Sequence, residues 1–217
     1  MDIHSTLDKM TEPFYKGLQL YEPLYFLQIH INRPIDEIMV LVVAIVAVLV
    51  CLPLPWIRTI FLRKLYATGW GFAIGFYAYG ATFWLYVAFV LVSWLLMTIL
   101  PQQIKSRGLI VISFAFLLVV SIYYFFMGKS DAISVKIPIM VGFVKLSYVA
   151  FNLQDAATLK AGTKHQLTER EIKYSEPFKN GPVGLFDWVQ YFVFCGSIAF
   201  GMAIEYKDFN DWINLRA

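Results

Sequence analysis

Long apolar runs alternate along this chain with short charged connections, and the pattern predicts a bundle of membrane helices. A run of about 20 apolar residues is long enough to cross the hydrocarbon core as a helix. The expected fold is therefore all-α: a polytopic integral membrane protein with about six membrane-embedded helices in one domain over residues 35–217. The expected spans are 38–55, 65–80, 82–100, 109–127, 137–155 and 183–204.

The boundary between the second and third spans follows from length. After a short basic connection that includes Arg63, no charged residue occurs between Leu65 and Leu100. As one helix this run would be roughly 54 Å long, against about 30 Å of hydrocarbon, so we expect it to fold back near Gly80–Thr82. Gly71 and Gly75 form a GxxxG pair in its first half, which would permit another helix to approach closely.

The polar segments predict elements at the membrane surface. Residues 1–34 mix charged and aromatic side chains, so we expect an interfacial segment with one amphipathic helix. No basic-then-apolar signal segment opens the chain, and the first apolar run is expected to be a retained span. The longest polar stretch is a loop over 157–182, where Thr168 and Glu171 match a capping box and predict a short helix ending before Pro177.

Composition supports membrane insertion. The 217 residues are 59% hydrophobic and 15% charged, and the mean hydropathy is +0.62. Soluble domains are about 45–50% apolar and about 25% charged, so membrane lipids are the expected surroundings. The net charge of +3 is too small and too scattered to indicate nucleic acid as a partner. Cys51 and Cys195 lie inside apolar runs, where we expect packing residues rather than a disulfide framework.

One predicted span carries a polar stripe. Lys145, Tyr148, Asn152 and Asp155 fall within an arc of about 80° on a helix over 137–155. Because polar groups are costly against lipid, this stripe should face a protein interior or a water-filled cavity. The alternative interpretation is a polar seam that only joins helices together.

The residues alone define no reaction. The sequence contains no phosphate-binding glycine loop, no nucleophilic serine motif and no Cys/His pattern with metal-ligand spacing. The histidines are His4, His30 and His165, and all three lie in polar segments outside the predicted spans. Neither a catalytic residue nor a metal site can therefore be assigned from these residues.

Two sequence blocks add a family resemblance. The run MVGFVKLSYVAFNLQDA, Met140–Ala156, resembles the helix M-V-x-x-x-K-x-S-x-x-A-F-x-x-x-D-G of the membrane-bound O-acyltransferases, and it is most similar to their lysophospholipid acyltransferase branch. The second block follows a charged linker. At the positions that recur in the family, this chain carries Gly201, Glu205, Tyr206, Asp208, Phe209 and Ile213. Two positions depart from the family pattern, Ala156 for glycine and Met202 for proline; the resemblance spans about 35–214.

The resemblance implies acyl transfer from acyl-CoA to a lysophospholipid hydroxyl, which is phospholipid remodelling, with acyl-CoA as co-substrate and no other cofactor. It implies a membrane-buried tunnel in the endoplasmic reticulum and a histidine general base. Family members are about twice as long and carry that histidine in their C-terminal half, so this chain is expected to be an N-terminal portion without a catalytic residue. The predicted tunnel-lining residues are Lys145, Tyr148, Asn152, Asp155, Glu205 and Tyr206.

Three functional hypotheses follow. The first is the N-terminal portion of a lysophospholipid acyltransferase, completed by further sequence or by another polypeptide. The second is a catalytically inactive relative that serves as a structural subunit of a membrane assembly. The third is an unrelated small transporter or channel, for which an inverted repeat would be expected, and the sequence contains no such repeat.

Overall fold

A computed structural model describes residues 24, 26, 27, 30, 35–126, 135–162 and 167–214. The expected interfacial segment 1–34 lies almost entirely outside these residues, as do His4 and His165. Across the described ranges every regular element is helical, which confirms the all-α prediction. The elements are α3 (Ile35–Cys51), η1 (Leu54–Trp56), α4 (Ile60–Tyr79), η2 (Gly80–Thr82), α5 (Phe83–Ile99), α6 (Gln102–Phe126), α7 (Lys136–Lys160), α8 (Glu169–Ser175), η4 (Glu176–Phe178), α9 (Leu185–Val193), α10 (Cys195–Phe200) and α11 (Tyr206–Asn214).

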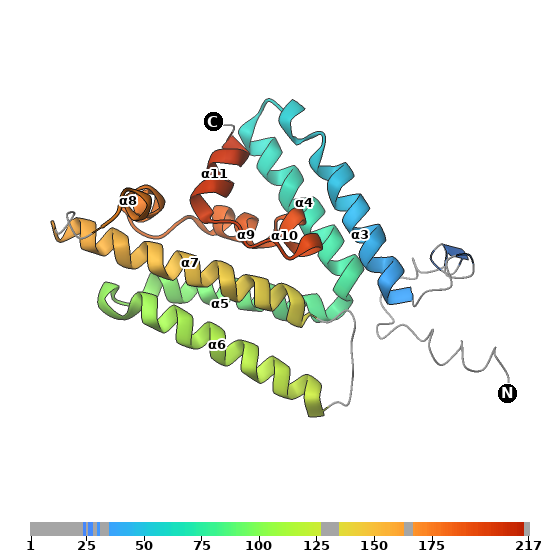
Figure 1. Ribbon diagram of the computed structural model, residues 1–217, viewed down its shortest axis with the longest axis horizontal. Coiled ribbons are helices and arrows are strands. Elements are labelled where there is room, and N and C mark those ends of the chain that lie inside the picture. The colour runs from blue at the N-terminus through green and yellow to red at the C-terminus, as the bar shows by residue number, and fades with distance from the viewer. Residues whose placement is uncertain are drawn as a thin grey trace.

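The helices form two groups joined by a third. Helices α5, α6 and α7 run side by side, while α3 and α4 form a pair inclined to them (Figure 1). Helices α9, α10 and α11 lie between these groups and contact both, and α8 packs on the C-terminal end of α7 (Figure 1). The short helices that follow the polar loop therefore join the two groups of long helices.

Three helices in the described part of the chain are long and apolar enough to cross a membrane. They include the segments Glu37–Trp56, Ile104–Tyr123 and Lys136–Lys160. Two further apolar helical segments, Phe83–Ile99 and Leu185–Phe200, are shorter. Large apolar side chains are exposed along the outer faces of α3 and α6, as expected where lipid covers a helix.

The apolar run after Leu65 folds back where its length predicts. Helix α4 ends at Tyr79, and α5 begins after η2, with Gly80 at a φ of 57°. The GxxxG pair does permit close approach, because a Cβ on Gly71 would lie 1.7 Å from the carbonyl oxygen of Val193. A Cβ on Gly75 would lie 2.2 Å from the ring of Phe83. Both neighbours belong to this same chain, in α9 and α5.

The last predicted span differs from a continuous helix. It is divided into α9 and α10 by extended backbone at Phe194, and Gly201 ends α10 at a φ of 67°. A helix end leaves carbonyl groups without intrahelical partners. Side chains from other helices take two of these: the Lys145 ammonium donates to the Tyr191 carbonyl oxygen at 2.6 Å, and the Tyr86 hydroxyl donates to that of Phe192 at 2.8 Å.

The predicted capping box is confirmed. The Glu171 amide donates to the Thr168 hydroxyl oxygen at 3.4 Å, and the Thr168 amide donates to the Glu171 carboxylate at 2.7 Å. Helix α8 begins there and ends at Ser175, before the turn that contains Pro177. This short helix lies against the C-terminal half of α7, where it forms one side of a polar cavity.

Candidate functional site

Lys145, at one end of the polar stripe on α7, is enclosed by protein. Its side chain is 1% exposed, and its ammonium donates to the Tyr191 carbonyl oxygen at 2.6 Å and to the Ser197 hydroxyl at 2.7 Å. The same nitrogen lies 4.5 Å from the ring centroid of Tyr191, within range of a cation–π interaction. Lys145 therefore joins α7 to α9 and α10, and it is not among the lining residues of the three cavities described below.

The other three stripe residues face a cavity of about 340 Å³ between α7, α8 and the segment before α11. Tyr148, Asn152 and Asp155 line it from α7. Glu205 lines it from the extended segment after α10, so four of the six predicted residues surround one space. The remaining lining residues are Phe151, Thr168, Arg170, Glu171 and Tyr174.

A polar chain crosses this cavity. The Asn152 amide donates to one carboxylate oxygen of Glu205 at 3.2 Å, and Arg170 pairs with the other at 3.3 Å. Asn152 is 6% exposed, whereas the Arg170 side chain is 76% exposed. Glu205 thus connects a buried amide on α7 to a solvent-exposed guanidinium on α8, and brings the two sequence blocks of the family resemblance into contact.

The rim of the cavity contains further polar contacts. The Tyr174 hydroxyl donates to the Asp208 carboxylate at 2.9 Å, and this hydrogen bond raises the pKa of Tyr174 above its usual value. On the same side of α11, the Lys207 ammonium donates to the Glu176 carboxylate at 2.8 Å, and this hydrogen bond lowers the pKa of Glu176. These contacts fasten α11 to α8 and η4, and so fix the position of Glu205 just before α11.

Tyr206 does not line the cavity. Its ring is buried between those of Phe178 and Tyr191, at centroid distances of 5.4 and 5.2 Å, and burial raises its pKa. The neighbouring Tyr191 hydroxyl donates to the Ile204 carbonyl oxygen at 2.6 Å, next to Glu205. Tyr206 therefore helps to position the segment that carries Glu205.

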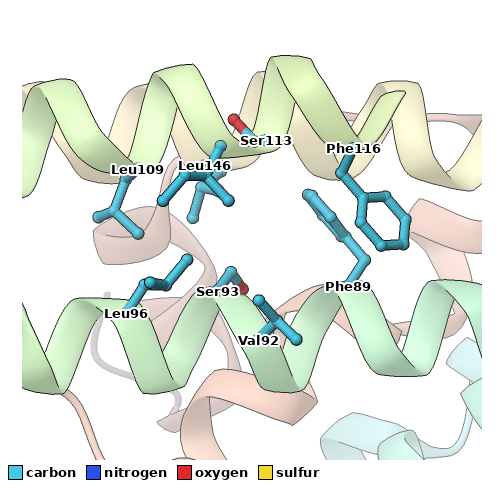
Figure 2. Close-up of a pocket in the computed structure, with 9 residues that line it drawn as sticks. Phe89, Val92, Ser93, Leu96, Leu109, Ser113, Phe116 and Leu146 are labelled. Carbon is cyan, nitrogen blue, oxygen red and sulfur yellow. The ribbon is translucent and has the colours of Figure 1, made fainter. Parts of the chain in front are cut away.

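Two other cavities differ in character. The space shown in Figure 2 lies between α5, α6 and α7, measures about 10 Å³, and is lined mainly by apolar side chains such as Phe89, Leu109 and Leu146. That volume is close to the least that one water molecule needs. A cavity of about 350 Å³ between α3 and α4 has apolar and aromatic walls, including Val43, Trp70 and Ile74. Polar and charged groups converge only on the cavity beside α8, among the cavities described.

Arg170 and Tyr174 are lining residues that the sequence pattern missed. Both lie on α8, within a loop that is predicted from sequence as a solvated connection. The signal that could have found them is their spacing: residues four apart on the capped helix share one face. The sequence gives no indication that this face meets α7.

The cavity presents both signs of charge. Asp155, Glu171 and Glu205 are acidic, Arg170 is basic, and Tyr148 and Tyr174 add hydroxyl groups and aromatic rings. Such a set can bind a polar or zwitterionic group through ion pairs and hydrogen bonds. Within the described residues, no group of three or more His, Cys, Asp or Glu side chains could hold a metal ion.

Over the described residues, the fold and cavity define a helical protein with three helices of membrane-spanning length and a polar cavity beside one of them. No family model, no curated protein and no solved structure matches the chain.

Proposed function

We propose that this chain forms one wall of the substrate tunnel of a membrane-bound lysophospholipid acyltransferase, with about six membrane-embedded helices, in the endoplasmic reticulum. The observation that carries the proposal is the contact between the two blocks of the family resemblance. Asn152 in the first and Glu205 in the second are 53 residues apart in sequence and hydrogen-bonded at 3.2 Å. They meet in the cavity where polar groups of both signs converge.

The level of the cavity fits a phospholipid head group. Helix α7 has 25 residues, which corresponds to about 38 Å, against about 30 Å of hydrocarbon. The cavity residues Asn152 and Asp155 lie in its C-terminal third, near the expected membrane–water interface. There Arg170 would bind the lipid phosphate, and the carboxylates and tyrosine rings would bind a cationic or hydroxyl-bearing head group.

In this proposal the chain binds and orients the substrates, acyl-CoA and the lysophospholipid. The acyl transfer itself requires a general base that removes the proton of the lysolipid hydroxyl. No histidine is among the cavity-lining residues. We infer that the base comes from further sequence or from another polypeptide that completes the tunnel.

A second candidate function is that of a structural subunit without catalysis. Lys145 favours it, because this residue of the family motif donates its hydrogen bonds to Tyr191 and Ser197 within the protein. In that case the polar stripe acts as a seam between helices, and the cavity holds a resident lipid or a neighbouring chain.

One experiment separates these possibilities. The purified chain in lipid nanodiscs would be tested for binding of radiolabelled lysophosphatidylcholine and acyl-CoA, and for formation of the diacyl product. Product formation supports the acyltransferase, and binding of both acyl-CoA and lysophosphatidylcholine without product supports a tunnel wall that needs a completing partner. The absence of acyl-CoA binding and of transfer, with or without lipid binding, would overturn the acyltransferase proposal and favour the structural subunit.

A further inference from the structure

The two cysteines of the chain lie beside each other in the fold. Cys51 is the last residue of α3 and Cys195 is the first of α10, so 144 positions separate them in sequence. Their sulfur atoms are 3.4 Å apart, within hydrogen-bonding distance of one thiol to the other. The chain contains only these 2 cysteines.

The two thiols differ in access. Cys195 is fully buried, at 0% exposure, whereas Cys51 is half-buried. Cys51 also ends its helix, and the turn that follows leads to the highly exposed Trp56. Cys51, near the C-terminal end of the apolar segment Glu37–Trp56, is therefore the thiol that a reagent from outside the protein meets first.

We propose that Cys51 and Cys195 form a redox-active dithiol, which a low-molecular-weight disulfide such as oxidised glutathione converts into an internal disulfide between α3 and α10. The Cys51 thiolate attacks one sulfur of the oxidant, forms a mixed disulfide and releases one glutathione thiolate. The Cys195 thiolate then attacks the Cys51 sulfur and releases the second glutathione. Two protein thiols are oxidised, one external disulfide is reduced to two thiols, and the protons pass to the departing thiolates.

The geometry suits this bond. A disulfide needs its sulfur atoms at about 2.05 Å, so the present separation must close by roughly 1.4 Å. Cys195 is the first residue of α10, directly after Phe194, whose carbonyl oxygen accepts the first hydrogen bonds of that helix from the Ser197 and Ile198 amides at 2.9 and 3.1 Å. Because Cys195 lies at the start of its helix and Cys51 at the end of α3, the movement that the bond requires falls on two helix ends and not on a helix interior.

A disulfide between Cys51 and Cys195 would affect the segment that leads to the polar cavity. Ser197, two residues beyond Cys195, accepts a hydrogen bond from Lys145, and the same segment continues to Glu205 in the polar cavity. A disulfide would fasten α10 to α3 and restrict the movement of this segment. The inference is independent of the proposed function, because it concerns the two thiols and not the ligand of the cavity.

The test is a mass measurement on the purified full chain in detergent. The protein would be incubated with reduced or with oxidised glutathione, quenched in acid, denatured and alkylated with iodoacetamide. We expect oxidised glutathione to give a monomer that is lighter by two hydrogen atoms and takes up no alkylating groups. Its melting temperature should rise by roughly 5–15 °C relative to the reduced protein, because the bond closes a long loop.

Single variants test the order of attack. Cys195→Ser should retain one glutathione on Cys51, because the resolving thiol is gone. Cys51→Ser should take up no glutathione, because Cys195 is buried. The proposal is overturned if the oxidised wild-type protein keeps both thiols open to alkylation, keeps glutathione on Cys51, or forms a disulfide-linked dimer on a non-reducing gel.

Discussion

Lys145 and Asn152 lie two helical turns apart on one face of α7, but their surroundings are opposite. Helices α9 and α10 cover Lys145, and its partners are a backbone carbonyl and a hydroxyl. Asn152 is also largely buried, yet its partner Glu205 opens onto a cavity and continues to the exposed Arg170. Helical periodicity groups side chains on a face, whereas the elements that cover the face decide whether the group holds the fold together or meets a ligand.

The comparison predicts different energetic roles for the two ends. At the Lys145 end water is excluded, so a lost hydrogen bond leaves buried polar groups unpaired and lowers stability. At the cavity end water can replace a lost partner, so substitutions there should cost little stability and should instead alter binding. The expected losses in the free energy of unfolding therefore decrease from the Lys145 end of the stripe to the cavity end.

The largest effect is expected for Lys145→Ala. The substitution removes a fully buried side chain and leaves the Tyr191 carbonyl and the Ser197 hydroxyl without their donor. We expect the free energy of unfolding in detergent, measured by denaturant titration, to fall by about 3–5 kcal/mol. Lys145→Met is the matched control, since it keeps most of the volume and should lose only about 1–3 kcal/mol. A loss below about 1 kcal/mol for the alanine variant would mean that water reaches this end too.

The next effect concerns the close contact that holds α9 in place. In Gly71→Ala the new Cβ would lie 1.7 Å from the Val193 carbonyl oxygen, and a backbone atom cannot yield without moving α9. We expect a loss of about 1–3 kcal/mol in the same titration. Gly69→Ala is the control, because it lies two residues away on α4 with nothing within 4 Å of its Cβ. It should be neutral or stabilising by up to about 1 kcal/mol, since alanine favours the helix. Equal losses for both variants would contradict the observed packing.

Sequence periodicity predicts the long helices well and their neighbours poorly. The turn at Gly80, the capped helix at Thr168 and the face shared by Lys145 and Asn152 all follow from local patterns. The division at Phe194 does not, because the run around it is apolar throughout and the break is stabilised by donors from other helices.

Arg63 illustrates the same limit. The sequence places it in a short basic connection, where a solvated side chain would be expected. In the fold it is 3% exposed and donates to the carbonyl oxygens of Leu54, Ile57 and Ile213, at 3.1, 2.6 and 2.7 Å. Helix α11 supplies one of these acceptors from 150 positions away. Contacts with segments so distant in the sequence cannot be predicted from the residues around Arg63.

At the cavity end, Arg170→Ala should separate binding from stability. The side chain is 76% exposed, so its ion pair with Glu205 should contribute no more than about 1 kcal/mol to folding. If the cavity binds a phospholipid head group, the loss of a charge-assisted hydrogen bond to phosphate should weaken lysophosphatidylcholine binding about 10–100-fold. Binding of the radiolabelled lipid in nanodiscs measures this effect.

Lys173→Ala is the matched control for Arg170→Ala. It removes an equal charge from an exposed position on the same helix, and Lys173 does not line the cavity. Its lipid affinity should stay within about twofold of the wild type, because Lys173, although its nitrogen lies 5.5 Å from the ring centroid of the lining residue Tyr174, is itself not a lining residue. A similar loss for both variants would indicate general electrostatic attraction to the lipid and not a specific site.

The smallest effect is expected for Glu176→Gln, at the exposed pair with Lys207. The hydrogen bond from Lys207 lowers the pKa of the Glu176 carboxyl from 4.5, and the same bond raises the pKa of Lys207 from 10.5. Because the Glu176 pKa is lower in the folded state, the pair stabilises the fold at pH values above the pKa of Glu176 in the unfolded chain. This stability is lost as the pH falls through the pKa of Glu176 in the folded protein. Because the Lys207 pKa is higher in the folded state, the pair stabilises the fold at pH values below the pKa of Lys207 in the unfolded chain. This stability is lost as the pH rises through the pKa of Lys207 in the folded protein.

The difference between wild type and Glu176→Gln should therefore be widest near neutral pH and should disappear in acid. Because the Glu176 side chain is 59% exposed, we expect a difference of only about 0.2–1 kcal/mol at neutral pH. Thermal unfolding at a series of pH values measures it, with Glu169→Gln, which removes the same charge from another exposed position, as the control. A difference above about 2 kcal/mol at neutral pH would be as large as that of a buried ion pair, although this pair is exposed. Exposure to water would then not explain the energetic contrast between the two ends of the α7 stripe.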